Sequence, residues 1–140
     1  MKAGMAGRFV DECPDALREL MHVLNDNGIH YQVEKGGIRL AFSKGGRVWE
    51  TVARSAPQTL LLYGLYPFEV ETSGRLLSQL NEINEILVNG GLFVSSGRIV
   101  LRTGADLFDA YSAQESIMRA LEYNAGAIVR FWHALQSAAQ

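Results

Sequence analysis

Apolar and polar positions along this chain follow a helical period in some stretches and a strand period in others. Over residues 14–27 the apolar positions recur at intervals of three and four, at Leu17, Leu20, Met21 and Leu24. This spacing places them on one face of a helix, and Asn27-Gly28 supplies the left-handed residue that commonly ends one. We therefore expect a first amphipathic helix, preceded by a flexible leader over residues 1–13.

From residue 29 to residue 65 the apolar positions change to a two-residue period. Ile38, Leu40 and Phe42 alternate with polar or small residues, which predicts a half-buried strand. Glycine-containing turns at 35–37 and 43–46 separate short strands, and two more strands are predicted over 48–53 and 58–65. Short turns between consecutive strands indicate an antiparallel meander of four strands.

The fourth of these strands has apolar side chains on both faces. Leu60 and Leu62 point to one side, and Leu61, Tyr63 and Leu65 point to the other. Such a strand is either central and covered twice, or it faces a partner. Each leucine-sized side chain buried at an interface contributes roughly 1.5–3 kcal/mol before association costs. This strand is therefore a candidate protein-contact surface.

The second half of the chain returns to a helical pattern and then adds two strands and a last helix. A helix is predicted over 75–88, with Thr72 or Ser73 as its N-cap. Strands follow over 92–94 and 98–103, and Ser112 to Glu115 forms a capping box that begins the last helix. The expected class is α+β in the order α-β-β-β-β-α-β-β-α, as a single domain over residues 14–140.

Asn81 and Asn84 lie beside the apolar stripe of the predicted middle helix, although asparagine is a weak helix former. They could contact a partner. The favoured interpretation is structural: Asn84 hydrogen-bonds backbone where the helix meets the next hairpin, since buried amides need partners.

Composition narrows the class of protein. The chain has 140 residues, 48% hydrophobic and 20% charged, with a formal charge of −2, which offers no electrostatic footprint for nucleic acid or an anionic membrane. No apolar run approaches the roughly 18–20 residues that span a bilayer. Cys13 is the single cysteine, so an internal disulfide is impossible and a cytoplasmic location is expected.

Candidate chemistry is sparse. His22, His30 and His133 fall in different predicted elements without metal-ligand spacing, and the glycine pairs match no phosphate-binding motif. Cys13 could act as a nucleophile only beside a histidine. We therefore expect no catalytic residue, metal or cofactor, and no enzymatic activity.

Six basic residues fall on the predicted strands and turns: Arg39, Lys44, Arg47, Arg54, Arg98 and Arg102. They could form a patch. Because acidic residues are in excess, protection of sheet edges against aggregation is the favoured interpretation.

Several segments of the chain resemble proteins of the YbjN-domain family. These are Tyr66-Pro67-Phe68-Glu69-Val70, the stretch from Leu76 to Asn84, the stretch from Gly91 to Arg102, and Arg130-Phe131-Trp132-His133-Ala134-Leu135. Together with the element order, the resemblance extends over residues 14–136. Members of this family are described as candidate regulators of bacterial sensory transduction.

The resemblance implies a fold like that of class I type III secretion chaperones, which are small cytoplasmic homodimers that bind extended segments of effector proteins. It implies a twisted antiparallel sheet with helices packed on it, a homodimer, and no catalytic residue. This chain is less acidic than a dedicated secretion chaperone.

The first functional hypothesis is a non-enzymatic protein-binding module, chaperone-like or regulatory, whose partner is another protein. Its contact residues are expected to be Trp49, Leu61, Tyr63 and Leu65, while Leu76, Leu80, Ile83 and Asn84 are expected nearer a dimer interface or partner contact. The alternative is a small-molecule sensor with a pocket between the sheet and the last helix, lined by Tyr123, Trp132 and strand residues.

Overall fold

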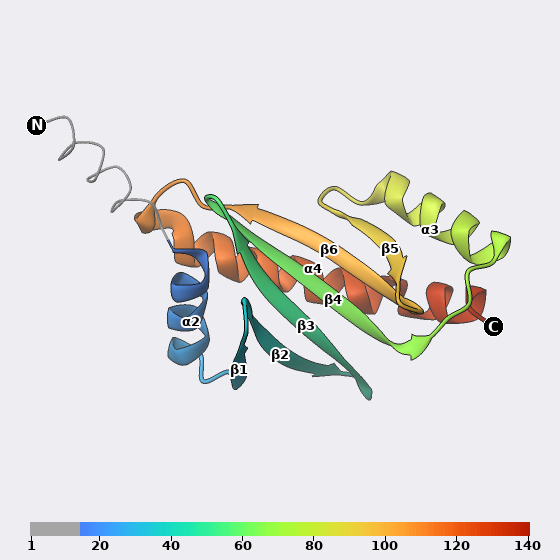
Figure 1. Cartoon of the computed structure of the whole chain (residues 1–140), viewed down its shortest axis with the longest axis horizontal. Coiled ribbons are helices and arrows are strands. Elements are labelled where there is room, and N and C mark those ends of the chain that lie inside the picture. Colours follow the sequence, from blue (N-terminus) through green and yellow to red (C-terminus); the bar gives the residue numbers. More distant parts are fainter. Residues whose placement is uncertain (1–14) are drawn as a thin grey trace, which may run out of the picture.

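The computed structural model describes residues 15–140, which form three helices and six strands in the predicted order (Figure 1). The elements are α2 (Ala16–Asp26), β1 (Tyr31–Glu34), β2 (Gly37–Lys44), β3 (Arg47–Ala56), β4 (Thr59–Glu69), α3 (Gly74–Ile86), β5 (Gly91–Ser95), β6 (Arg98–Asp106) and α4 (Ala110–Ala138). The predicted α+β class and element order are confirmed.

All six strands form one antiparallel sheet in the order β1-β2-β3-β4-β6-β5. The first four strands make the predicted meander. The β5–β6 hairpin then joins it with β6 beside β4, so β3, β4 and β6 occupy the middle of the sheet and β1 and β5 form its edges.

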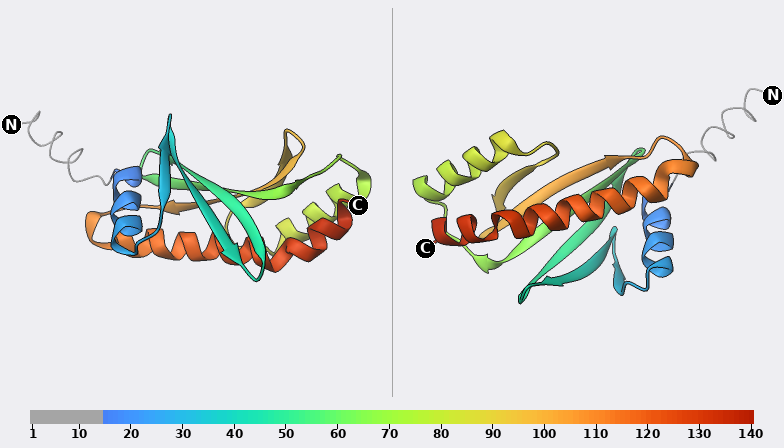
Figure 2. Two further views of the ribbon diagram at one scale, coloured as in Figure 1. Left: turned by 90° about the horizontal axis from the view of Figure 1, so that it is seen from below. Right: turned by 180° about the vertical axis from the view of Figure 1, so that it is seen from behind.

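The three helices lie on the same face of the twisted sheet, as the view along the sheet shows (Figure 2). Helix α4 crosses the whole sheet. Helix α2 packs near the first residues of α4, and α3 packs near its last residues. One apolar cluster fills the space under α2 and the first half of α4, with Leu20, Leu24, Leu62 and Ile117 fully buried. A second fills the space under α3 and the rest of α4.

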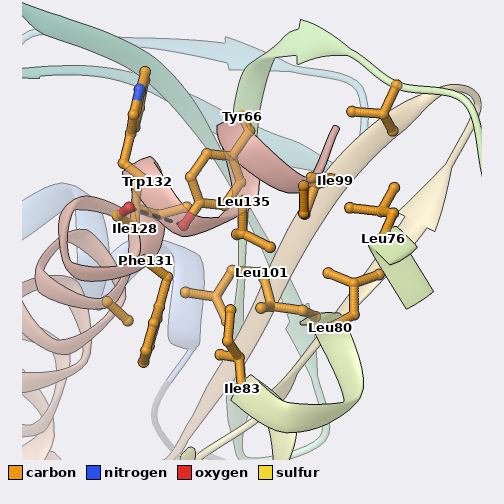
Figure 3. Packing of buried hydrophobic residues seen from close by; sticks show 14 of the residues in the cluster. Tyr66, Leu76, Leu80, Ile83, Ile99, Leu101, Ile128, Phe131, Trp132 and Leu135 are labelled. Atoms are coloured by element: carbon orange, nitrogen blue, oxygen red, sulfur yellow. Dashed lines mark hydrogen bonds between the residues drawn. The ribbon is translucent and has the colours of Figure 1, made fainter. Parts of the chain in front are cut away.

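The second cluster is built around aromatic side chains (Figure 3). Trp132 of α4 contacts Tyr66 and Phe68 of β4, with ring centroids 5.5 Å and 5.7 Å away. The Tyr66 hydroxyl donates a hydrogen bond to the Ile128 carbonyl at 2.8 Å, and burial raises the pKa of this hydroxyl. The hydroxyl therefore stays protonated and ties β4 to α4.

The last helix begins earlier than the capping box predicts. Asp109 is the N-cap, and its carboxylate accepts hydrogen bonds from the Ser112 backbone N–H at 2.9 Å and the Ser112 hydroxyl at 3.1 Å. These bonds hold the pKa of Asp109 below its usual value. The prediction of Ser112 as the cap is wrong, because a carboxylate three residues earlier already satisfies the first-turn donors.

The fourth strand is longer than predicted and continues through Pro67 to Glu69. Its pairing with β3 ends at Leu65, and its register with β6 shifts between Leu65 and Glu69. A proline without an N–H is tolerated there because the regular ladder has stopped. At the other end of the chain, Asp15 caps α2, and the predicted leader over 1–13, with Cys13, lies outside the described residues.

Candidate functional site

Figure 2 shows that no described helix covers the second face of the sheet. Apolar side chains lie at the centre of this face. We call it the open face and define its apolar part by six residues of β3, β4, β5 and β6: Val52, Leu61, Tyr63, Leu65, Phe93 and Val100. Its centre is a shallow hollow of about 260 Å³.

Strand register brings these residues together. Leu65 of β4 lies opposite Val100 of β6, which in turn lies opposite Phe93 of β5. Tyr63 lies between Val52 of β3 and Arg102 of β6. Apolar side chains on adjacent strands thus form one continuous stripe that is one side chain wide at Leu61, two at Tyr63 and three at Leu65.

The burial of β4 follows the predicted alternation. Leu60 and Leu62 are fully buried under the helices, whereas Leu61, Tyr63 and Leu65 are half-buried on the open face. Phe93 remains 39% exposed. The sequence left two possibilities for this strand, and the structure shows a central strand that its own chain covers on one face.

The other predicted contact residues lie in the core. Trp49 packs against Phe42 at 5.7 Å and Trp132 at 6.1 Å between ring centroids, on the helix-covered face. Leu76, Leu80 and Ile83 are at most 5% exposed and fill the space between α3 and the sheet. Since the chain's own core occupies these side chains, only Leu61, Tyr63 and Leu65 of the predicted set share one accessible surface.

Asn84 has the structural role that the sequence favoured. Its amide accepts a hydrogen bond from the Leu92 N–H at 2.7 Å and donates one to the Leu92 carbonyl at 3.1 Å. Leu92 belongs to the edge strand β5, so Asn84 satisfies backbone groups as a further strand would. This pairing attaches α3 to the sheet.

Asn89, which the sequence analysis did not single out, binds both backbone groups of one residue in the same way, but on β6, one strand further from the edge. Its amide donates to the Gly104 carbonyl at 2.7 Å and accepts from the Gly104 N–H at 3.2 Å, beyond the end of β5. The Asn89 N–H donates to the Tyr123 hydroxyl at 3.2 Å. The Asn-Gly-Gly sequence that ends the α3 connection was the available indication.

Replacing Asn84 with alanine is expected to lower the free energy of unfolding by about 1–3 kcal/mol, because two backbone groups of Leu92 lose their partner. Urea denaturation measures the difference. Asn81→Ala is the matched control, since Asn81 is exposed on the same helix, and it is expected to change stability by less than about 0.5 kcal/mol. Equal losses in both variants would contradict the capping role.

The edge-protection interpretation fits Lys44, which lies past the end of β1, but it is wrong for the basic residues that have a strand on each side. The sheet edges are β1 and β5, whereas the six basic residues lie on β2, β3 and β6. Strand β1 flanks β2 only as far as Leu40, which covers Arg39 but not Lys44, whereas β5 flanks β6 from Arg98 to Arg102. Arg47 instead lies over the Trp132 ring at 5.7 Å on the helix-covered side.

Among the described residues, no group of histidines, cysteines and carboxylates could hold a metal ion, and no helix has the length and apolarity that a bilayer crossing requires. The two residues expected to line a sensor pocket, Tyr123 and Trp132, lie in different surroundings. Tyr123 lines a surface hollow with Val88 and Phe131, whereas Trp132 is buried among aromatic rings.

Of the comparisons with known proteins, the one with solved structures agrees with the predicted architecture. No protein-family model and no curated protein sequence matches the chain. Among solved structures, the crystal structure of YbjN from E. coli, described as "a putative transcription regulator", is similar with a TM-score of 0.62 and 17% sequence identity. The likeness covers 84% of this chain and 92% of that one. The chain therefore has a YbjN-like fold, as the resemblance in its sequence predicted.

Proposed function

We propose that this protein is a non-enzymatic protein-binding module, chaperone-like or regulatory, that binds its partner on the open face. The observation that carries the proposal is the asymmetry of the sheet. Three helices cover one face of the described sheet. On the other face Leu61, Tyr63 and Leu65 are half-buried and Phe93 is exposed, beside Val52 and Val100, which their neighbours bury. A contiguous exposed apolar patch of this kind is typical of an interaction surface.

The shape of the open face favours a protein over a small molecule. Small ligands are usually enclosed in deep pockets, whereas this hollow is shallow and lies on a sheet surface. Tyr63 and Phe93 offer broad aromatic contact area, the type of side chain that dominates protein interfaces. The likeness in fold to a candidate regulator supports the same broad class.

We further propose that the protein forms a homodimer, which the resemblance to secretion-chaperone-like proteins implies. Sedimentation equilibrium of the full chain tests this directly. If the protein stayed monomeric at concentrations up to 100-fold above those at which the partner binds, the homodimer proposal would be wrong. The partner-binding proposal would be unaffected.

The test of the binding surface is affinity capture from a lysate of the source cells with two matched double variants. Leu65→Ser with Phe93→Ser removes apolar side chains from the open face. Ile86→Ser with Val88→Ser removes apolar side chains that are 55% and 93% exposed beside α4. Both double variants should keep the fold, which circular dichroism and thermal unfolding check.

We expect wild type and the Ile86/Val88 variant to retain the same partner, and the Leu65/Phe93 variant to bind it at least about 100-fold more weakly. This estimate takes about 1.4 kcal/mol, a factor of ten, for each truncated anchor. Loss only in the Ile86/Val88 variant would move the site to the α3–β5 connection. Equal binding by all three proteins would overturn the open face as the binding surface.

A further inference from the structure

Charged side chains of both signs surround the apolar part of the open face: Arg39 lies opposite Val52, and Glu50 lies opposite Leu65. The chain carries a formal charge of −2, yet two exposed arginines flank the apolar part of β4. Arg54 of β3 lies opposite Leu61, and Arg102 of β6 lies opposite Tyr63. Because adjacent strands are about 4.8 Å apart and the two arginines are offset by two residues along β4, their backbones stand about 12 Å apart, one on each side of β4.

The nearby carboxylates do not neutralise this pair. Glu34 and Glu50 are both bound to Arg39, with nitrogen–oxygen distances of 3.0 Å and 3.3 Å. Asp106 accepts a hydrogen bond from the Thr59 hydroxyl at 3.4 Å, at the far end of β4. Glu50 lies on the open face opposite Leu65, but its carboxylate is paired with Arg39 and not with Arg54 or Arg102.

Neither Arg54 nor Arg102 forms an ion pair with a described residue. Arg54 donates one hydrogen bond to the Gly36 carbonyl at 3.3 Å, which leaves most of its donors unused. Both residues lie on internal strands, so protecting an edge does not explain them. The Arg54 side chain extends over Gly37 to the Gly36 carbonyl, and the Arg102 side chain is exposed opposite Tyr63, so neither guanidinium is neutralised by a described carboxylate.

From this juxtaposition, and resting on the proposed function, we propose that the open face binds a protein segment in which apolar side chains are flanked by aspartate or glutamate. Apolar side chains of the segment contact the accessible side chains of Tyr63, Leu65 and Phe93. Its carboxylates pair with Arg54 and Arg102, where a planar guanidinium can form two parallel hydrogen bonds. Apolar contact supplies most of the affinity, and the arginines select acidic sequences over basic ones.

The probe is a displayed library of random 12-residue peptides, selected against the full chain, with enriched sequences then synthesised for titration. We expect enrichment of acidic residues together with leucine, isoleucine, valine or phenylalanine. The double variant Arg54→Glu with Arg102→Glu should bind these peptides about 100-fold more weakly, at roughly tenfold for each charge pair. It should in turn select basic peptides.

The matched control is Arg18→Glu with Arg75→Glu, which makes the same change in net charge at exposed positions of α2 and α3. It should bind the acidic peptides within about twofold of wild type. Raising the salt concentration should weaken the binding of acidic peptides by wild type and, because it screens repulsion, strengthen their residual binding by the charge-reversed variant.

The outcomes separate this inference from the proposed function. If the selected peptides show no acidic enrichment but bind the Leu65/Phe93 variant more weakly than wild type, the inference is wrong and the open face remains a protein-binding surface. Peptides that bind all variants equally overturn both. Two other occupants would also overturn it: a second copy of the chain, seen as self-association abolished by Arg102→Glu, or nucleic acid, seen as tighter binding of a 12-nucleotide single-stranded DNA than of any peptide.

Discussion

Replacing Leu62 with alanine is expected to lower the free energy of unfolding by about 2–5 kcal/mol, the usual cost of an alanine at a fully buried leucine. Leu62 is 0% exposed and packs under α2 and α4. The same change at the adjacent Leu61 is expected to cost about 1 kcal/mol or less, since this side chain is half-buried on the open face. Urea denaturation of both variants measures the two free energies.

The comparison tests the asymmetry on which the proposed function depends. Both substitutions remove the same atoms from neighbouring positions of one strand, so strand propensity and composition cancel. If Leu61→Ala cost as much as Leu62→Ala, the open face would be covered in the free protein. A binding site there would then require the covering group to leave.

The sequence predicted the fold of this chain because its periodic patterns were regular and its turns carried glycine. It also predicted that β4 would be apolar on both sides, and that Asn84 would bind backbone near the β5–β6 hairpin. These features depend on the spacing of residues that are close together along the chain, and a single sequence shows that spacing directly.

What the sequence did not reveal depends on how the elements are ordered in the sheet. Placing β6 beside β4, and β5 at the edge, makes Val100 and Phe93 neighbours of Leu65 and puts Arg54 and Arg102 on internal strands. Nothing in the spacing of these residues fixes that order. Trp49 was also predicted at the contact surface, although its position in β3 directs it to the helix-covered face.

The order of the strands also gives Asn89 and Gly90 their roles, and Gly90→Ala is the second substitution with a large expected effect. Gly90 has a φ of +79°, and an added Cβ would overlap the Arg102 carbonyl oxygen of β6. Relieving that overlap separates the chain from β6 and strains the Asn89–Gly104 hydrogen bonds. We expect a loss of about 3 kcal/mol or more, from left-handed strain and weakened buried hydrogen bonds together.

Gly45→Ala separates these two causes. Gly45 also has a positive φ, +59°, but an added Cβ there meets nothing within 4 Å. This control should cost only the strain of the left-handed region, about 1–2 kcal/mol, and urea denaturation of the two variants gives the difference. A similar loss in both would show that contact between the α3–β5 connection and β6 adds nothing to stability. The larger loss at Gly90 would instead indicate that this connection holds β6 in the register that aligns Arg102 with Tyr63 and so completes the open face.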